Sequence, residues 1–212
     1  MLNLYTAAYE GKLFVVQQLL ENEPTAIESK DEDERNALHW AAMGGRLDVV
    51  EYLLNEGANV NAADDLRLDM VMSYNVYLNT ALIRVSKMKV DKPHCAHYAA
   101  SKGNVEVCRL LLEHKAAVNA INKIKQTPLH RAAAQGSTPL VNALLHAKAR
   151  LNPKDFEGNT PLHLACEEGH GDTAAVLLQN GADVDALNLE GKSSLDLTTA
   201  PLRSFLNRYI EE

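Results

Sequence analysis

The chain has 212 residues, of which 46% are hydrophobic and 5% aromatic, and its formal net charge is −7 at pH 7. This length allows one or two domains, and a core poor in rings and rich in Ala, Leu and Val suits helices packed on helices. The acidic balance argues against a nucleic-acid binder, which usually carries a basic face, and favours protein partners.

The cysteines and the N-terminus indicate the compartment. Three cysteines, Cys95, Cys108 and Cys166, form no paired framework, which predicts a reducing environment. Residues 1–11 lack a basic stretch followed by an apolar run, so no signal peptide is expected. The most apolar segment, residues 68–85, is interrupted by polar and charged positions and does not predict a membrane span. We expect a protein of the cytoplasm and nucleus.

A step of 33 residues organises the chain. The string Thr-Pro-Leu-His at 127–130 recurs at 160–163, and Ala-Leu-His at 37–39 matches it earlier in the chain. Gly103, Gly136 and Gly169 keep the same step, and a stretch with apolar residues at helical spacing follows each of these glycines. Each unit is therefore predicted to hold an inner and an outer helix, and stacking of the units creates the core.

The ends of these helices carry recognisable signals. Thr127 and Thr160 are good N-caps, and the proline that follows each of them suits the first helical position. Gly136 and Gly169 can end the inner helices with a left-handed residue.

The ends of the outer helices are less uniform. Gly57 and Gly181 close two of them, whereas Lys115 and Lys148 stand at the corresponding positions of two others. We expect some loss of stability at these lysines if the backbone there is left-handed.

One unit departs from the pattern. The segment 68–92 has only 25 residues and lacks the tetrapeptide, the inner glycine and the closing Asn. Either it forms a distorted helical unit that preserves the stack, or it loops out and leaves two sub-arrays. The near-helical spacing of Met70, Val71 and Tyr74 favours the first interpretation. The predicted division is an N-terminal capping repeat at 1–34, repeats at 35–67, 93–125, 126–158 and 159–191, the degenerate short repeat at 68–92, and a C-terminal cap at 192–212, about seven units in all.

The order T-P-L-H-x-A, glycine, apolar helix and Gly-Ala-x-Val-Asn resembles the ankyrin-repeat family over most of the chain. The resemblance implies an all-α ankyrin-repeat solenoid, a stack of helix–turn–helix units with β-turn fingers. Ankyrin stacks bind many kinds of partner, so the fold alone assigns no function.

Several runs are more specific than the general repeat. Residues 8–13, 31–41, 97–102, 130–134 and 157–166 resemble the gankyrin family. This resemblance implies a non-enzymatic assembly chaperone of the 26S proteasome regulatory particle, whose concave face binds the C-terminal domain of a proteasomal AAA ATPase subunit. The alternative is an ankyrin-repeat adaptor, or an inhibitor of a cyclin-dependent kinase or another signalling protein.

The resemblance also implies a binding site. Arg35 and Lys102 would receive carboxylates of the ATPase domain, and Asp33 and Asp65 would receive its basic groups. Mixed charge of this kind fixes register and rejects wrong partners. Aromatic and cationic side chains also follow the motif histidine in three units and are candidate anchors. The predicted partner-binding residues are Asp33, Arg35, Trp40, Asp65, Tyr98, Lys102 and Arg131.

A second motif competes with the helical pattern. Leu164, Cys166 and Glu168 spell L-x-C-x-E, a string that binds retinoblastoma-type pocket proteins when extended. Here it falls in an inner helix, where Leu164 and Cys166 are expected to pack in the core. Retinoblastoma-type proteins and a cyclin-dependent kinase remain further candidate partners, and we expect the protein itself to be a monomer.

No set of residues predicts catalysis. His94, Cys95 and His97 match no zinc spacing, and the sequence contains neither a glycine-rich phosphate loop nor a G-x-S-x-G elbow. We therefore expect no enzyme, no metal and no cofactor. The motif histidines are expected to bond local backbone or the motif Thr; they are His39, His97, His130 and His163.

Overall fold

The computed structural model describes residues 3–64 and 95–210. Within these ranges the chain forms helices joined by turns and hairpin-like loops, and one isolated bridge pairs Leu187 with Ser193. The α-helices are α1 Leu4–Glu10, α2 Leu13–Asn22, α3 Ala37–Gly44, α4 Leu47–Asn55, α6 Cys95–Ser101, α7 Val105–Glu113, α8 Pro128–Ala134, α9 Thr138–His146, α10 Pro161–Glu167, α11 Gly171–Gln179 and α12 Ala200–Leu206. Short 3-10 helices are η1 Pro24–Glu28, η3 Ser194–Leu197 and η4 Asn207–Tyr209.

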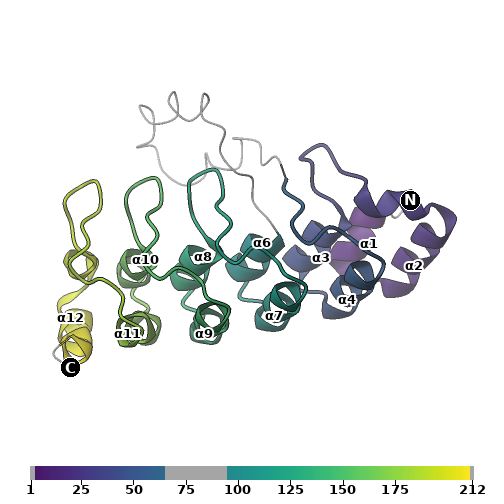
Figure 1. Ribbon diagram of the computed structural model, residues 1–212. Helices are drawn as coiled ribbons and strands as arrows, with labels where there is room; N and C mark the ends of the chain where they lie inside the picture. Colours follow the sequence, from purple (N-terminus) through teal and green to yellow (C-terminus); the bar gives the residue numbers. More distant parts are fainter. Residues whose placement is uncertain (1–2, 65–94, 211–212) are drawn as a thin grey trace.

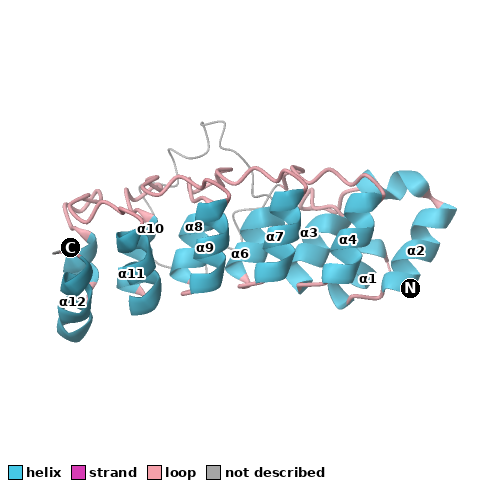
Figure 2. Ribbon diagram, turned by 60° about the horizontal axis from the view of Figure 1, so that its bottom comes forward, coloured by secondary structure: helices cyan, strands magenta, loops and turns pink. Residues whose placement is uncertain are grey.

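The helices form two rows along one stack, with the termini at opposite ends (Figure 1). The inner row holds α1, α3, α6, α8 and α10, and the outer row holds α2, α4, α7, α9 and α11. The last pair is η3 with α12. The loops that connect one unit to the next, which we call fingers, run along the same edge of the stack (Figure 2). The predicted all-α solenoid is confirmed.

The unit of α3 and α4 packs directly on the unit of α6 and α7 (Figure 1). The degenerate repeat predicted at 68–92 lies outside the described residues. The described residues form one continuous stack of six helix pairs, and the predicted division of the chain into seven units stays a prediction.

Small residues line the contacts between inner helices. Ala41 of α3, Ala99 of α6 and Ala132 of α8 are fully buried, which lets neighbouring helices approach closely. Leucines of the inner helices are buried as well. Leu129 and Leu162 are 0% and 1% exposed, and burial of such a side chain contributes about 1.5–3 kcal/mol.

The predicted caps are confirmed, and the motif histidines take part in them. In α8 the Thr127 hydroxyl accepts from the His130 backbone N–H, and the Thr127 N–H donates to His130 Nδ1 at 3.1 Å. Thr160 and His163 repeat the arrangement in α10. These contacts are the local bonds that the sequence predicted.

The same histidines also join one unit to the next. In His130 and His163 Nδ1 accepts a hydrogen bond, so the proton lies on Nε2, which donates to a carbonyl 29 residues further along. His97 reaches the carbonyl of Gln126 at 2.9 Å and His130 that of Asn159 at 3.1 Å. His163 does the same with Lys192 at 3.1 Å. The tetrapeptide is thus both a cap and a link between repeats.

The two lysines that replace a closing glycine have the expected backbone. Lys115 and Lys148 have φ of 67° and 66°, while Gly57 and Gly181 have φ of 92° and 87°. A left-handed residue with a side chain costs about 1–2 kcal/mol relative to the right-handed region. The prediction of a left-handed cost at these positions is confirmed in its geometry.

Candidate protein-binding site

Each finger is shaped by one side-chain oxygen. Asp31 Oδ1 accepts from the backbone N–H of Asp33 and of Arg35, both at 2.9 Å. The same bonds to the second and fourth following residues recur in three later fingers. These acceptors are Asn122, Asp155 and Asn188. The finger before α3 is therefore a regular finger whose acceptor carries a charge.

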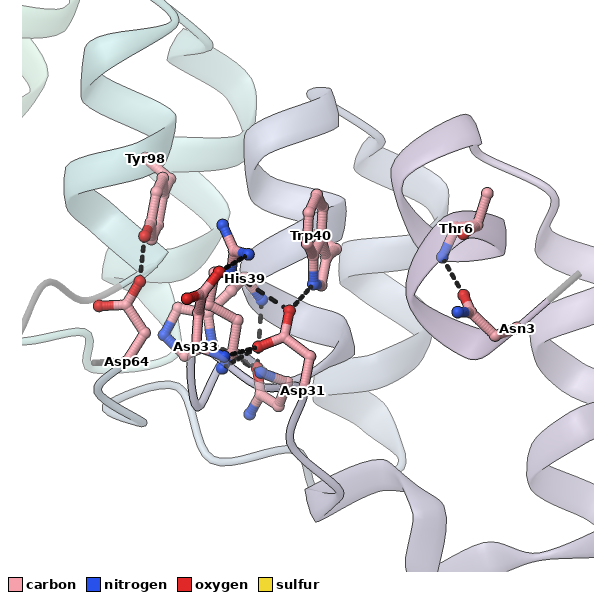
Figure 3. A network of polar contacts seen from close by, with 10 residues as sticks. Asn3, Thr6, Asp31, Asp33, His39, Trp40, Asp64 and Tyr98 are labelled. Atoms are coloured by element: carbon pink, nitrogen blue, oxygen red, sulfur yellow. Dashed lines mark hydrogen bonds and ion pairs between the residues drawn. The ribbon is translucent and has the colours of Figure 1, made fainter. Parts of the chain in front are cut away.

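The second oxygen of Asp31 organises a cluster of side chains (Figure 3). Oδ2 accepts from Trp40 Nε1 at 2.9 Å and from Arg35 Nε at 3.2 Å. Burial acts to raise the pKa of Asp31, but the hydrogen bonds from Arg35 and Trp40 lower it on balance. Asp31 is therefore held as a carboxylate at the base of the finger. We call Asp31, Asp33, Arg35 and Trp40 the Asp31 cluster.

Arg35 is the centre of this cluster and not a free cation. It is only 9% exposed, it pairs with Asp33 as well as Asp31, and its guanidinium lies 4.3 Å from the centroid of the Trp40 ring. The predicted contact residues Asp33 and Arg35 are thus bound to each other. A partner that uses Arg35 would compete with two carboxylates, whereas Asp33 keeps part of its surface exposed.

A second pair lies one unit along, on α6. The Tyr98 hydroxyl donates to the carboxylate of Asp64, and the Tyr98 ring meets His39 edge-on with centroids 5.9 Å apart (Figure 3). Asp64 is fully buried, and its other oxygen has no hydrogen-bond partner among the described residues. Burial raises the pKa of Asp64 to about 6, although the Tyr98 hydrogen bond and the charges of Arg35 and Lys123 act in the opposite direction.

The remaining predicted site residues lie along the same row of helices, except one. Lys102 follows the end of α6 and is exposed. Arg131 of α8 is half-buried, and its Nε donates to Ser101 Oγ at 2.8 Å. Asp65 lies outside the described residues. The structure therefore brings Lys102 and Arg131 to adjacent inner units, and it brings Asp33, Arg35 and Trp40 into one cluster.

Four units present the same position to the surface of the inner row. The residues after the motif histidines are Trp40, Tyr98, Arg131 and Leu164, and all four are half-buried. Trp40 also meets Tyr9 edge-on at 6.0 Å between centroids. We call these four residues the ladder. Its three predicted anchors, Trp40, Tyr98 and Arg131, are each held by a hydrogen bond to another side chain.

Leu164 and Cys166 of the L-x-C-x-E string lie in α10, as expected from the preceding Thr-Pro, and Glu168 is the C-cap residue of this helix. Cys166 is 1% exposed, and burial raises the pKa of its thiol to about 12. The expectation that Leu164 also packs in the core is wrong: it is half-buried, because it occupies the ladder position. The helix hides Cys166, so the string is not available in extended form in this structure.

Two acceptors, Asp31 and Asp64, were not among the predicted site residues. They lie 33 residues apart, and the same step separates Asn122, Asp155 and Asn188. This spacing was present in the sequence and could have identified them. The resemblance names Asp33 and Asp65 instead, which lie two positions and one position after Asp31 and Asp64 in the sequence.

Other kinds of site find no support in the described part of the chain. No group of three His, Cys, Asp or Glu side chains at 3–64 or 95–210 is placed to hold a metal ion. None of the described helices is long and apolar enough to cross a membrane.

Comparison with known families decides the fold family. Ankyrin repeats, in three matching copies, cover residues 3–64, 70–155 and 96–188. The chain belongs to the ankyrin-repeat family. This ankyrin-repeat protein is a non-catalytic scaffold, and its paired helices, capped tetrapeptides and fingers have the roles that the family pattern implies.

Comparison with individual proteins narrows the likeness further. The chain is 32% identical over 139 residues to the probable 26S proteasome regulatory subunit p28 of Saccharomyces cerevisiae, an alignment of 59% of this chain and 61% of the relative. It is 46% identical over 56 residues to the 26S proteasome non-ATPase regulatory subunit 10 of Dictyostelium discoideum, covering 26% of this chain and 24% of the relative. The chain thus spans less than two thirds of either protein.

Short matches alone do not separate functions. The serine/threonine-protein kinase VIK of Arabidopsis thaliana is 44% identical over 57 residues, covering 27% of this chain and 13% of the kinase. A pair of repeats is shared by proteins of different activity. The 139-residue match therefore carries more weight than the higher identities over shorter segments. It makes this protein similar to the proteasome regulatory subunits, in line with the gankyrin-family resemblance.

Proposed function

We propose that this ankyrin-repeat protein is an assembly chaperone of the proteasome regulatory particle and binds the C-terminal domain of a base ATPase subunit. The observation that carries the proposal is the 139-residue likeness to the yeast proteasome subunit p28. The yeast protein and the Dictyostelium protein are both named as proteasome regulatory subunits. Under this proposal the protein works in the cytoplasm and the nucleus.

The binding surface that we propose is the inner-helix row together with the finger before α3, which carries Asp33. The ladder residues offer partly exposed rings and a cation at regular steps, which suits a partner with complementary groups at the same spacing. The charges come from Asp33, Lys102 and Arg131. Mixed charge on a preformed surface gives specificity and rapid association more than raw affinity.

The Asp31 cluster has a supporting role in this proposal. Arg35 is held by two carboxylates and by the Trp40 ring, so its main contribution is to fix Asp33 and Trp40 in position. Asp33 and the exposed edge of Trp40 then meet the partner without a large ordering cost. Replacing Arg35 thus changes the surface as well as removing a charge.

Pull-down with the purified C-terminal domain of a proteasomal ATPase subunit tests the proposal. Lys102→Glu is the cleanest variant, because Lys102 is exposed and lies outside the Asp31 cluster. We expect it to weaken the complex about tenfold and Arg35→Glu to weaken it more, with added salt weakening the parent complex. Arg109→Glu on the outer helix α7 is the matched control and is expected to bind like the parent.

The outcomes separate the site from the function. Binding of the ATPase domain that survives both Lys102→Glu and Arg35→Glu would place the contact elsewhere. Failure of the parent to bind, together with capture of a cyclin-dependent kinase, would favour the alternative inhibitor role. Circular dichroism at 222 nm checks that each variant keeps its helices.

A further inference from the structure

The distribution of charge along the stack sets one region apart. Residues 114–154 contain seven Lys and Arg and no Asp or Glu. By contrast, residues 1–64 hold 12 Asp and Glu against 4 Lys and Arg, and residues 155–212 hold 11 against 3. A chain with a net charge of −7 thus carries a cationic segment between two acidic ends.

Part of this segment lines a shallow groove of about 470 Å³ between two successive fingers. Every lining residue belongs to a finger, and none belongs to a helix, so the groove is separate from the ladder on the inner row. We call it the cationic finger groove. Its lining residues are Ile121, Lys125, Arg150, Asn152, Pro153 and Lys154.

The three cations of the groove are not paired with an acidic side chain in the described part of the chain. No carboxylate of the described residues forms an ion pair with Lys125, Arg150 or Lys154. The nearby Asp155 is buried, and its Oδ1 accepts two backbone N–H groups of its own finger. The positive charge is therefore available to a ligand.

The cations are also held on a fixed frame. Lys154 Nζ donates to the Leu187 carbonyl at 2.8 Å, and Lys125 Nζ lies 5.7 Å from the centroid of the Phe156 ring. The backbone N–H of Arg150 donates to Asn119 Oδ1 at 2.7 Å. These contacts reduce the freedom that a ligand would otherwise have to remove on binding.

We propose that the cationic finger groove binds a short acidic segment of a partner protein, in extended form. Lys125, Arg150 and Lys154 pair with its carboxylates, and the half-buried Ile121 and Pro153 contact an apolar residue between them. Adjacent repeats lie about 10 Å apart, the distance spanned by about three residues of an extended chain. Acidic residues three apart thus match successive fingers.

The acidic C-terminal part of the stack disfavours a long polyanion. A nucleic acid that filled the groove and continued towards the C-terminus would extend over residues 155–191, which contain eight Asp and Glu and no Lys or Arg. A short peptide ends before it reaches them. The groove therefore fits a segment of limited length better than a continuous chain of phosphates.

Fluorescence anisotropy with a fluorescein-labelled dodecapeptide tests this proposal. The probe carries Glu at every third position with Leu and Ser between, and a second probe has Lys in place of each Glu. The test variant combines Lys125→Glu, Arg150→Glu and Lys154→Glu. The matched control makes the same change at three exposed cations elsewhere, Lys30, Arg109 and Arg208.

The acidic probe is expected to bind the parent and the control alike, to lose at least tenfold in affinity with the test variant, and to weaken in 300 mM salt. The Lys probe is expected not to bind. The proposal is overturned by no binding of the acidic probe to the parent, by equal losses in the test and control variants, or by a thymidine dodecanucleotide binding the groove more tightly than the peptide. The test variant should retain the ATPase domain in the pull-down, which keeps this proposal distinguishable from the proposed function.

Discussion

Two steps of the same stack, from α8 to α10 and from α3 to α6, are linked by different polar contacts. Between α8 and α10 the link is the bond from His130 Nε2 to the Asn159 carbonyl, at 3.1 Å. Between α3 and α6 it includes Tyr98, which stacks edge-on against His39 and donates to the buried Asp64. The first link is neutral and local to the repeat motif, whereas the second contains an ionisable carboxylate.

The difference shows that the polar contact between two units can change while the helices keep the same packing in the stack. Small alanines keep the helix spacing in both steps, so Ala41, Ala99 and Ala132 are equally buried. The polar link between units is then free to change. The α8 to α10 step keeps a hydrogen bond between neutral groups, whereas the α3 to α6 step contains a buried ionisable carboxylate.

The largest effect is expected from removing the neutral link. His130→Ala leaves the Thr127 N–H and the Asn159 carbonyl buried without their partner and opens a cavity, at a cost of about 2–4 kcal/mol. Tyr98→Phe keeps the ring packing, and Asp64 can take up a proton, so its cost is about 1–2 kcal/mol. Urea unfolding followed by circular dichroism gives both values. A cost for Tyr98→Phe above that of His130→Ala would reverse the ranking of the two steps.

A smaller effect distinguishes the two steps by pH. Burial raises the pKa of Asp64 to about 6, so the folded state binds a proton that the unfolded state releases near pH 4, and this group destabilises the fold as pH rises from 4 to 6. Between pH 5 and pH 7 we expect the free energy of unfolding of Asp64→Asn to rise by about 1 kcal/mol relative to that of the parent. Urea unfolding at both pH values measures the change.

At the α8 to α10 step, stability is expected to change with pH in the opposite direction. Burial lowers the pKa of His130 and of His163, so their contribution is present above the unfolded pKa of about 6.5 and is lost as pH falls below it. The stability difference between the parent and His130→Ala should therefore shrink towards pH 5. A difference that grows towards pH 5 would contradict the neutral assignment of this histidine.

The smallest effect concerns the backbone and not the links. Lys148 has φ of 66°, which glycine adopts without strain, so Lys148→Gly is expected to stabilise the protein by about 0.5–1 kcal/mol. Arg150→Gly is the matched control. Its φ is not positive, and the added freedom of the unfolded chain should cost about 0.5 kcal/mol. Thermal unfolding of the two variants should shift in opposite directions.

Much of the fold could be predicted from local signals. The Thr-Pro caps, the left-handed Gly136 and Gly169, and the left-handed Lys115 and Lys148 follow from rules that involve only a few neighbouring residues. The contact of α3 with α6 could not be predicted in this way. A shortened interval in the sequence has the same appearance whether it contains a stacked unit or leaves the two flanking units in contact.

The candidate site was predicted less completely. The sequence pointed to Asp33, Arg35 and Trp40. It did not predict that Asp31 joins them by hydrogen bonds, which depends on where the finger lies relative to the inner helix. From its charge, Arg35 was expected to bind a carboxylate of the partner. In the fold it is nearly buried between the carboxylates of Asp31 and Asp33 and the ring of Trp40. Lys102 is exposed, as a contact residue requires.

The sequence by itself determined the repeat, its helices and its caps. The repeat follows from the 33-residue step, and the helices and caps depend on residues at most four positions apart. Only the tertiary structure decided which charges remain open to a partner. Arg35 is neutralised within its own finger, whereas Lys125, Arg150 and Lys154 meet no carboxylate of the described residues. The physical reason is that pairing of charges requires proximity in space, which the stacking of units sets and the order of residues does not.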